Sequence, residues 1–176
     1  MGAYSAINLQ VIQGPPGQDG LPGQDGLPGP IDTIVGFWES LYRNMEYAPH
    51  NTATNWLIEV GDGQVNNTNY FYLNRNNTRF HLNQSGWYRV NIVTLIQKFP
   101  GGSIVLIVLK DGIAQDRPYY HPDDPDVLQW YGCYTQFYIS SNGTNYYEFN
   151  IQGSSNPDLH PTQVYNQLGI EYVREL

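Results

Sequence analysis

The sequence predicts an all-β domain that is carried on a short triple helix. Three observations support this fold class: glycine recurs at every third position near the N-terminus, many short apolar segments separated by turn residues follow, and no long amphipathic helical pattern accompanies them. The composition agrees with this reading, because aromatic residues make up 14% of the 176 residues and charged residues only 14%. An average soluble domain has roughly 25% charged residues.

The glycine repeat spans residues 14–31 and forms consecutive triplets that each begin with glycine. In a collagen-like triple helix every third residue lies on the crowded axis, where only glycine fits, and proline presets the polyproline II backbone. A flexible linker is the alternative, but it has no reason to keep a period of three. The repeat therefore predicts a stalk about 55 Å long and a homotrimer with parallel chains. The axial residues are Gly14, Gly17, Gly20, Gly23, Gly26 and Gly29.

Residues 1–13 precede the stalk, and their second half alternates polar and apolar side chains, which is typical of a strand. A single strand is not stable alone. Either three copies pair with one another, or each copy adds to a sheet edge of another protein. We favour the second reading, an anchoring tail that binds a capsid or base protein. The segment also lacks the basic start and apolar core of a signal peptide, which disfavours ordinary secretion if Met1 is the native start.

The head is predicted over residues 32–176, where short strands alternate with turn residues. Residues 37–45 read either as a short helix or as a first strand. Many short strands at this spacing indicate a sandwich or barrel. The predicted turns are Gly61–Gly63, Asn74–Asn77, Gly101–Gly102, Asp111–Gly112 and Asn142–Gly143. The other predicted strands are Trp56–Val60, Tyr70–Leu73, Arg79–Leu82, Tyr88–Ile96, Ile104–Lys110, Cys133–Ser140, Asn145–Gln152 and Tyr165–Val173.

One local pattern begins at Phe80 and continues, after five residues, with Gly86, any residue, Tyr88, any residue and an apolar position. We expect Gly86 to permit a tight turn into a central strand, and Tyr88 to share a face with Val90. This pattern, the stalk before it and Gly169 in the last predicted strand resemble the C1q/TNF-like jelly-roll families. The resemblance covers nearly everything after the stalk and implies a jelly-roll sandwich.

The resemblance also implies an assembly. Heads of these families form compact trimers around an aromatic threefold axis and recognise partners through outer loops. Tyr146, Tyr147 and Phe149 are the aromatic residues that we consider for such an axis.

The formal net charge is -8, with 16 acidic and 8 basic residues. A nucleic-acid binder needs a basic stripe that replaces counterions along the phosphates, and the sequence contains no run of Lys or Arg. The same deficit argues against docking on an anionic membrane. The longest apolar stretch, Ile104–Leu109, is too short to span a bilayer. We therefore expect neither a nucleic-acid partner nor membrane insertion.

Segment 117–130 is predicted as an exposed loop between two groups of central strands. Tyr and Trp are favoured in binding patches because they combine apolar area with polar tips. We expect this loop to bind an unknown host protein or glycan receptor. The alternative is that Trp130 and Tyr131 start a strand and pack inward. The candidate ligand-binding residues are Tyr119, Tyr120, His121, Asp123, Asp124, Asp126 and Trp130.

Residues 121–126 form an acidic stretch that can offer oxygens to Ca²⁺, which takes six to eight of them. The stretch lacks the ordered spacing of a calcium loop, and its two prolines suit a stiff exposed loop equally well, so a metal remains open. The sequence contains no HExxH motif, phosphate loop or dinucleotide fingerprint, and we expect no cofactor and no enzymatic activity.

Cys133 is the one cysteine, so no disulfide can form within the chain. Its apolar surroundings predict a buried structural thiol. Asn-X-Ser/Thr sequons at Asn66, Asn76, Asn83 and Asn142 arise by chance in a chain this rich in Asn.

Two functions fit these patterns. The first is a spike or fibre on a virion or phage surface, with an anchoring tail, a short stalk and a trimeric head that attaches to a host. The second is a secreted, extracellular C1q-like recognition protein. We expect the first, because the chain starts without a signal and uses no disulfide.

Overall fold

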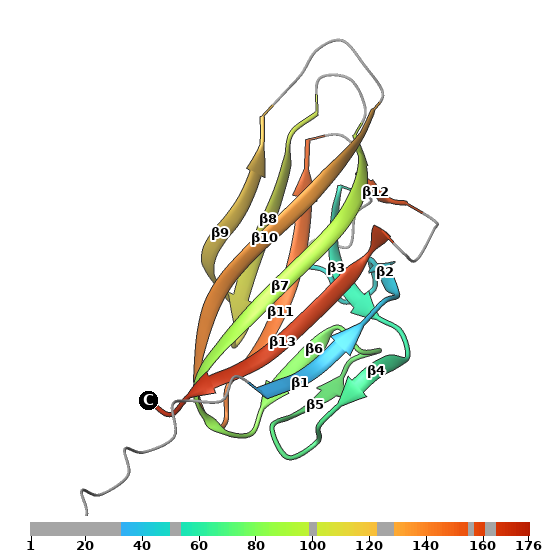
Figure 1. Ribbon diagram of the computed structural model, residues 1–176. Helices are drawn as coiled ribbons and strands as arrows, with labels where there is room; N and C mark the ends of the chain where they lie inside the picture. Colours follow the sequence, from blue (N-terminus) through green and yellow to red (C-terminus); the bar gives the residue numbers. More distant parts are fainter. Residues whose placement is uncertain (1–32, 50–53, 99–101, 123–128, 155–156, 161–164) are drawn as a thin grey trace, which may run out of the picture.

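The computed structural model describes residues 33–49, 54–98, 102–122, 129–154, 157–160 and 165–176 (Figure 1). Within these ranges the chain forms two antiparallel sheets and no α-helix. The predicted tail, residues 1–13, and stalk, residues 14–31, lie outside the described residues, so both stay predictions. The predicted all-β head is confirmed.

Sheet A has the strand order β10, β7, β13, β1 and β4, and β12 also pairs with β7. The two longest strands, β7 and β10, pair along their whole length, from Ser85 opposite Asn142 to Lys98 opposite Gln129. The bounds in sheet A are Thr33–Trp38 for β1, Gly63–Asn66 for β4, Ser85–Lys98 for β7, Gln129–Asn142 for β10, Asp158–Leu159 for β12 and Gln167–Arg174 for β13.

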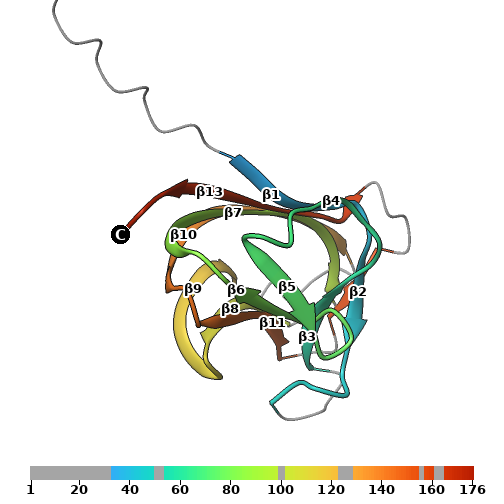
Figure 2. The ribbon, with the colours of Figure 1, turned by 90° about the horizontal axis from the view of Figure 1, so that it is seen from below.

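Sheet B has the order β2, β3, β11, β6 and β5, while β8 pairs with both β11 and β9. Figure 2 shows the two sheets curling around a common interior, with β9 at the margin opposite β2. The bounds in sheet B are Leu41–Asn44 for β2, Asn55–Val60 for β3, Phe71–Asn74 for β5, Arg79–Leu82 for β6, Ile104–Lys110 for β8, Ile113–His121 for β9 and Tyr146–Gly153 for β11.

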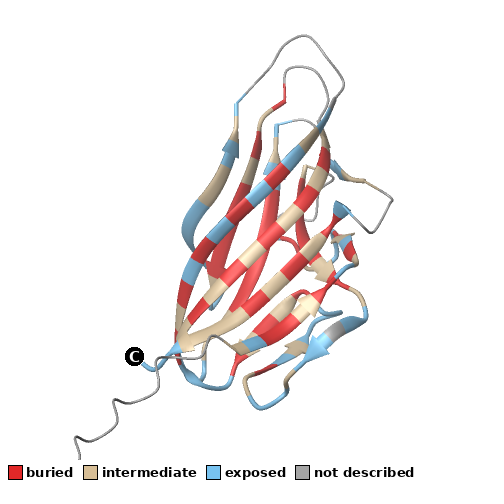
Figure 3. Cartoon of the chain, in the orientation of Figure 1, coloured by how far each residue is buried: buried red, intermediate tan, exposed pale blue. Residues whose placement is uncertain are grey.

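The core lies between the sheets because the strands alternate buried and exposed side chains. This alternation is visible along β7 and β10 in Figure 3. Trp38 is fully buried, and its ring meets those of Phe71 and Phe80 edge to face, with both centroid distances at 5.5 Å. Offset aromatic contacts of this kind add about 1 kcal/mol each beyond the buried area. The aromatic-rich composition therefore serves the core first.

Tight turns join β5 to β6 and β8 to β9 where the sequence predicts them, whereas the turn predicted at Gly101–Gly102 falls partly outside the described residues. The β8–β9 hairpin closes through Asp111 and Gly112, whose φ angles of 51° and 80° suit a two-residue hairpin turn. Three successive residues, Arg75, Asn76 and Asn77, adopt positive φ angles between β5 and β6. Asparagine tolerates this conformation better than most residues, which explains why the turn contains two of them.

Residues 37–45 contain no helix. Residues 37–44 belong to β1 and β2 and to the turn between them, Met45 follows β2, and β1 starts earlier, at Thr33. Apolar side chains of both strands face the core, β1 pairs with β13, and β2 pairs with β3. This pairing explains why the segment forms strands and not a helix.

The family pattern is placed largely as expected. Phe80, Tyr88 and Val90 are buried, and the Tyr88 hydroxyl donates to the Gln84 carbonyl oxygen at 2.9 Å. Gly86, however, is not in a turn, because it is the second residue of β7. A Cβ there would lie 2.4 Å from the Arg174 backbone oxygen, so close packing against the end of β13 requires the glycine.

Candidate functional site

A row of aromatic side chains projects from β10 on the outer face of sheet A. Tyr134 is 68% exposed, Tyr138 54% and Trp130 39%, while Cys133 and Phe137 point into the core. Soluble proteins rarely expose aligned large aromatics unless they bind something. We call the solvent-facing side of β10, β7 and β13 the outer face of sheet A.

The neighbouring strands extend this row. Tyr134 lies opposite Val93, and Tyr138 lies opposite Arg89. Arg89 in turn lies opposite Glu171 of β13, and its Nε donates to the Glu171 carboxylate at 2.7 Å. The outer face of sheet A thus combines exposed aromatic rings, which are enriched in protein interfaces, with an ion pair whose charges neutralise each other.

An apolar hollow of about 490 Å³ opens on the same face, where Trp87, Tyr138, Val173 and Arg174 converge. These residues come from β7, β10 and β13. The hollow adjoins the exposed row of β10, so both features belong to one surface that a partner of matching shape can cover.

The segment predicted as a ligand-binding loop, residues 117–130, forms strand at both of its ends. Residues 117–121 belong to strand β9, and Trp130 and Tyr131 start β10, so these positions are strand and not loop. The difference has a physical cause: among the described residues β9 pairs with β8 and with no other strand. It also contains Pro118, and prolines and polar residues are typical of edge strands. The alternation that identifies a half-buried strand is therefore absent from β9.

The side chains of this region divide into inward and outward sets. Tyr119 packs against the core, and burial raises its pKa to about 12. Tyr120 is exposed. The His121 ring lies 4.1 Å from the Tyr131 ring, which joins the end of β9 to the start of β10. Asp123, Asp124 and Asp126 lie outside the described residues, so the Ca²⁺ hypothesis stays open there.

Trp130 has partners that the sequence did not indicate. Its ring meets the His160 ring edge to face at 4.6 Å, and His160 meets Tyr165 at 5.0 Å. The cluster forms because β12 pairs with β7 beside Gln97, which is also the residue opposite Trp130. Trp130 therefore neither packs inward nor sits in a loop, but belongs to an exposed aromatic cluster.

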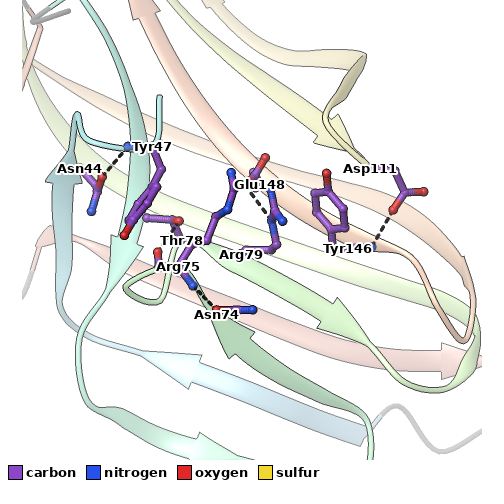
Figure 4. A network of polar contacts seen from close by, with 9 residues as sticks. All are labelled: Asn44, Tyr47, Asn74, Arg75, Thr78, Arg79, Asp111, Tyr146 and Glu148. Atoms are coloured by element: carbon purple, nitrogen blue, oxygen red, sulfur yellow. Dashed lines mark hydrogen bonds and ion pairs between the residues drawn. The ribbon is translucent and has the colours of Figure 1, made fainter. Parts of the chain in front are cut away.

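The outer side of sheet B carries a polar network instead (Figure 4). Arg79 pairs with Glu148 at 3.0 Å and lies 3.8 Å above the Tyr146 ring. Asp111 accepts a hydrogen bond from the Tyr146 backbone N–H at 3.0 Å, which ties the β8–β9 hairpin to β11. Arg79 and Glu148 neutralise each other, and Asp111 is bonded to the backbone of β11. The role of the network is therefore to stabilise the sheet.

His81 sits beside this network, stacked on Tyr72 at 4.4 Å. Burial lowers the pKa of His81, and the neighbouring Arg79 charge lowers it further. Nε2 of His81 is buried without a hydrogen-bond partner among the described residues. The neutral imidazole is thus the form that this fold accommodates.

The cysteine and the aromatic residues considered for a threefold axis lie mostly inside the protomer. Cys133 is buried, and burial raises its thiol pKa to about 12, so the predicted structural thiol is confirmed. The axis candidates Tyr147 and Phe149 are buried inside their own protomer. They fill the core from β11 and do not face outward. Tyr146, the third candidate, is half-buried on the outer side of sheet B, where Arg79 lies over its ring.

Within the described residues, no group of three or more His, Cys, Asp or Glu side chains could hold a metal ion. No helix in the part of the chain that the structure describes is long and apolar enough to cross a membrane.

No family model and no curated protein matches the sequence. Solved structures match the fold. Murine APRIL at pH 8.0 and at pH 5.0 matches with a TM-score of 0.55, at 10% and 11% identity, over 78% of this chain and 98% of theirs. Eiger TNF from S. frugiperda matches with a TM-score of 0.51 at 13% identity, over 84% of this chain and 95% of its own. At these identities the likeness concerns the fold alone: the head is a TNF-like jelly roll.

Proposed function

We propose that the protein is a non-enzymatic homotrimeric stalk-and-head protein on the surface of a virus or phage particle, where its head attaches to a host receptor. The observation that carries the trimeric part of the proposal is the exposed row of Trp130, Tyr134 and Tyr138, which offers a surface to a neighbouring head, on a head that directly follows the glycine triplets of residues 14–31.

The triplets supply the stoichiometry, because a collagen-like helix needs three chains. Three heads at the end of one stalk are held at a high effective concentration. The outer face of sheet A then offers each head a surface for its neighbour. A closed ring of three uses one pair of complementary patches three times, and exposed tyrosines beside an ion pair suit such a patch.

The tail and the head divide the remaining tasks. The apolar positions of residues 1–13 can add as strands to a sheet edge of a capsid or base protein. The three tails gain avidity for the particle and the three heads gain avidity for the host, because each bound copy raises the effective concentration of the next. A receptor bound weakly by one head is therefore retained by the trimer.

An antibody raised against the head tests the location and the role together. We expect it to label the outside of purified particles and to block their binding to host cells, and we expect soluble trimer to compete for the same cells. Recovery of the protein only as free trimer in the medium, with unlabelled particles, would contradict the spike role and favour a secreted recognition protein.

A further inference from the structure

A small hollow lies between two strands of different sheets, β2 of sheet B and β12 of sheet A. It measures about 190 Å³, and its lining includes Leu41, Tyr42, Arg43, Asp158, Leu159 and His160. Figures 1 and 2 place β2 on the margin opposite β9. The lining contains none of the exposed residues of β10, so this hollow is distinct from the one at Trp87 and Tyr138, although His160 in its wall touches Trp130 at the end of the exposed row.

Two opposite charges are fixed at its wall. Arg43 lies 3.5 Å from Asp158 and donates to the Pro157 carbonyl oxygen at 3.4 Å. The Asp158 carboxylate accepts the Leu159 backbone N–H at 2.9 Å, yet the Asp158 side chain remains 51% exposed. Backbone contacts therefore hold a cationic donor and an anionic acceptor side by side, which is the preorganisation that a binding site needs.

Aromatic rings border these charges. Tyr42 is 45% exposed on the β2 side. On the β12 side the His160 ring is held edge to face between Trp130 and Tyr165, and Tyr165 is 49% exposed. Aromatic side chains with one apolar face and one polar tip suit ligands that are themselves amphipathic.

We propose that this hollow binds one hexose ring of a neutral glycan. A sugar hydroxyl both donates and accepts a hydrogen bond, so neighbouring hydroxyls match a carboxylate that lies beside a guanidinium. The C–H face of the ring can pack on the aromatic border. The volume suits a single ring, because pockets for drug-sized ligands start at about 300 Å³.

The charge balance favours a neutral sugar over an anionic one. Arg43 and Asp158 cancel each other within the hollow, and the chain as a whole carries a net charge of -8. A sulfated or sialylated ring would meet no net positive field there. This inference deepens the attachment role proposed above, on which it rests, by naming the class of ligand that the head recognises.

Titration of the full-chain protein with a panel of simple sugars tests the inference. The neutral probes are the methyl glycosides of glucose, galactose, mannose, N-acetylglucosamine and N-acetylgalactosamine, and methyl glucuronide is the charged comparison. We expect saturation-transfer NMR to detect at least one neutral glycoside with a millimolar Kd, and no binding of the glucuronide.

Three variants locate the site. Asp158→Asn keeps the acceptor for the Leu159 N–H but removes the charge, and should weaken binding at least about tenfold, as expected for a lost charged hydrogen bond. Tyr42→Ala removes an exposed ring and should weaken binding about fivefold, since one stacked ring contributes about 1 kcal/mol. Asp116→Asn is the matched control: Asp116 is an exposed aspartate on β9, and the Kd should stay within about twofold.

Thermal melting of each variant separates loss of binding from loss of fold. Unchanged binding in a folded Asp158→Asn protein would overturn the inference, as would the absence of binding by every neutral glycoside. If no glycoside binds while the trimer still attaches to cells, only the glycan assignment is wrong. If the trimer does not attach to cells, the attachment role fails even if a glycoside binds.

Discussion

Gly86 at the start of β7 lies directly against Arg174 at the end of β13. A Cβ on Gly86 would come within 2.4 Å of the Arg174 backbone oxygen and 2.5 Å of the Tyr172 ring, and the φ angle of Gly86 is +154°. The contact closes the end of sheet A at which β1, the first described strand, begins. It gives a physical reason for the glycine in the family pattern.

Substitution of this glycine should therefore be costly. We expect Gly86→Ala to lower the free energy of unfolding by at least about 2 kcal/mol, because backbone strain and overpacking act together. Gly169→Ala is the matched comparison, since a Cβ there would meet Phe37 at an ordinary 3.7 Å, and its effect should stay below about 0.5 kcal/mol. Urea unfolding of both variants measures the difference. Equal effects would show that the close approach of Gly86 does not matter.

The stability of the head should fall in mild acid because of His81. The pKa of His81 is lowered in the folded state by burial and by Arg79, so the unfolded chain binds a proton first as the pH falls below about 6.5. A protonated His81 would also carry a buried N–H at Nε2, which has no partner among the described residues. Both effects favour unfolding.

Urea unfolding at pH 7.5 and at pH 5.5 provides the test. We expect wild-type protein to lose stability across this range and His81→Gln to lose distinctly less. If His81→Gln and wild type depend on pH identically, His81 is not the group responsible.

Cys133 should behave as a probe of folding. Burial raises its pKa to about 12, so at pH 8 almost no thiolate is present to react. We expect Ellman's reagent to modify the native protein far more slowly than a free thiol and to modify the urea-unfolded chain at once. Rapid modification under native conditions would mean that the strand pair β7–β10 opens readily.

The sequence predicted much of the fold for a clear reason. Strands such as β8, from Ile104 to Lys110, and β6, from Arg79 to Leu82, have the predicted bounds, because apolar side chains and flanking turn residues define them locally. Strand β9 was missed because its residues are almost all exposed. Its structure depends on pairing with β8, which no local pattern records.

The candidate site was harder to predict. Tyr119, Tyr120 and Trp130 stood out as aromatics, but nothing local distinguishes the half-buried Tyr119 from the exposed Tyr120 without the strand register. The ring that meets Trp130 is that of His160, which directly follows β12, and this contact exists only once β12 pairs with β7. Long-range pairing, and not composition, creates this part of the surface.

The most direct test of the account is the mass of the protein in solution, measured by light scattering coupled to gel filtration. We expect the wild-type chain, of 20.0 kDa, to run at three times its own mass. We expect Tyr134→Arg to run as a monomer, because a stalk of only six triplets needs the heads to hold the three chains together. The substitution would bury an unpaired charge where the outer face of sheet A meets the next head. Tyr72→Arg, the same change at another exposed tyrosine, on β5 of sheet B, should remain a trimer. A monomeric wild type, or a Tyr134→Arg variant that stays trimeric, would contradict assembly through this face.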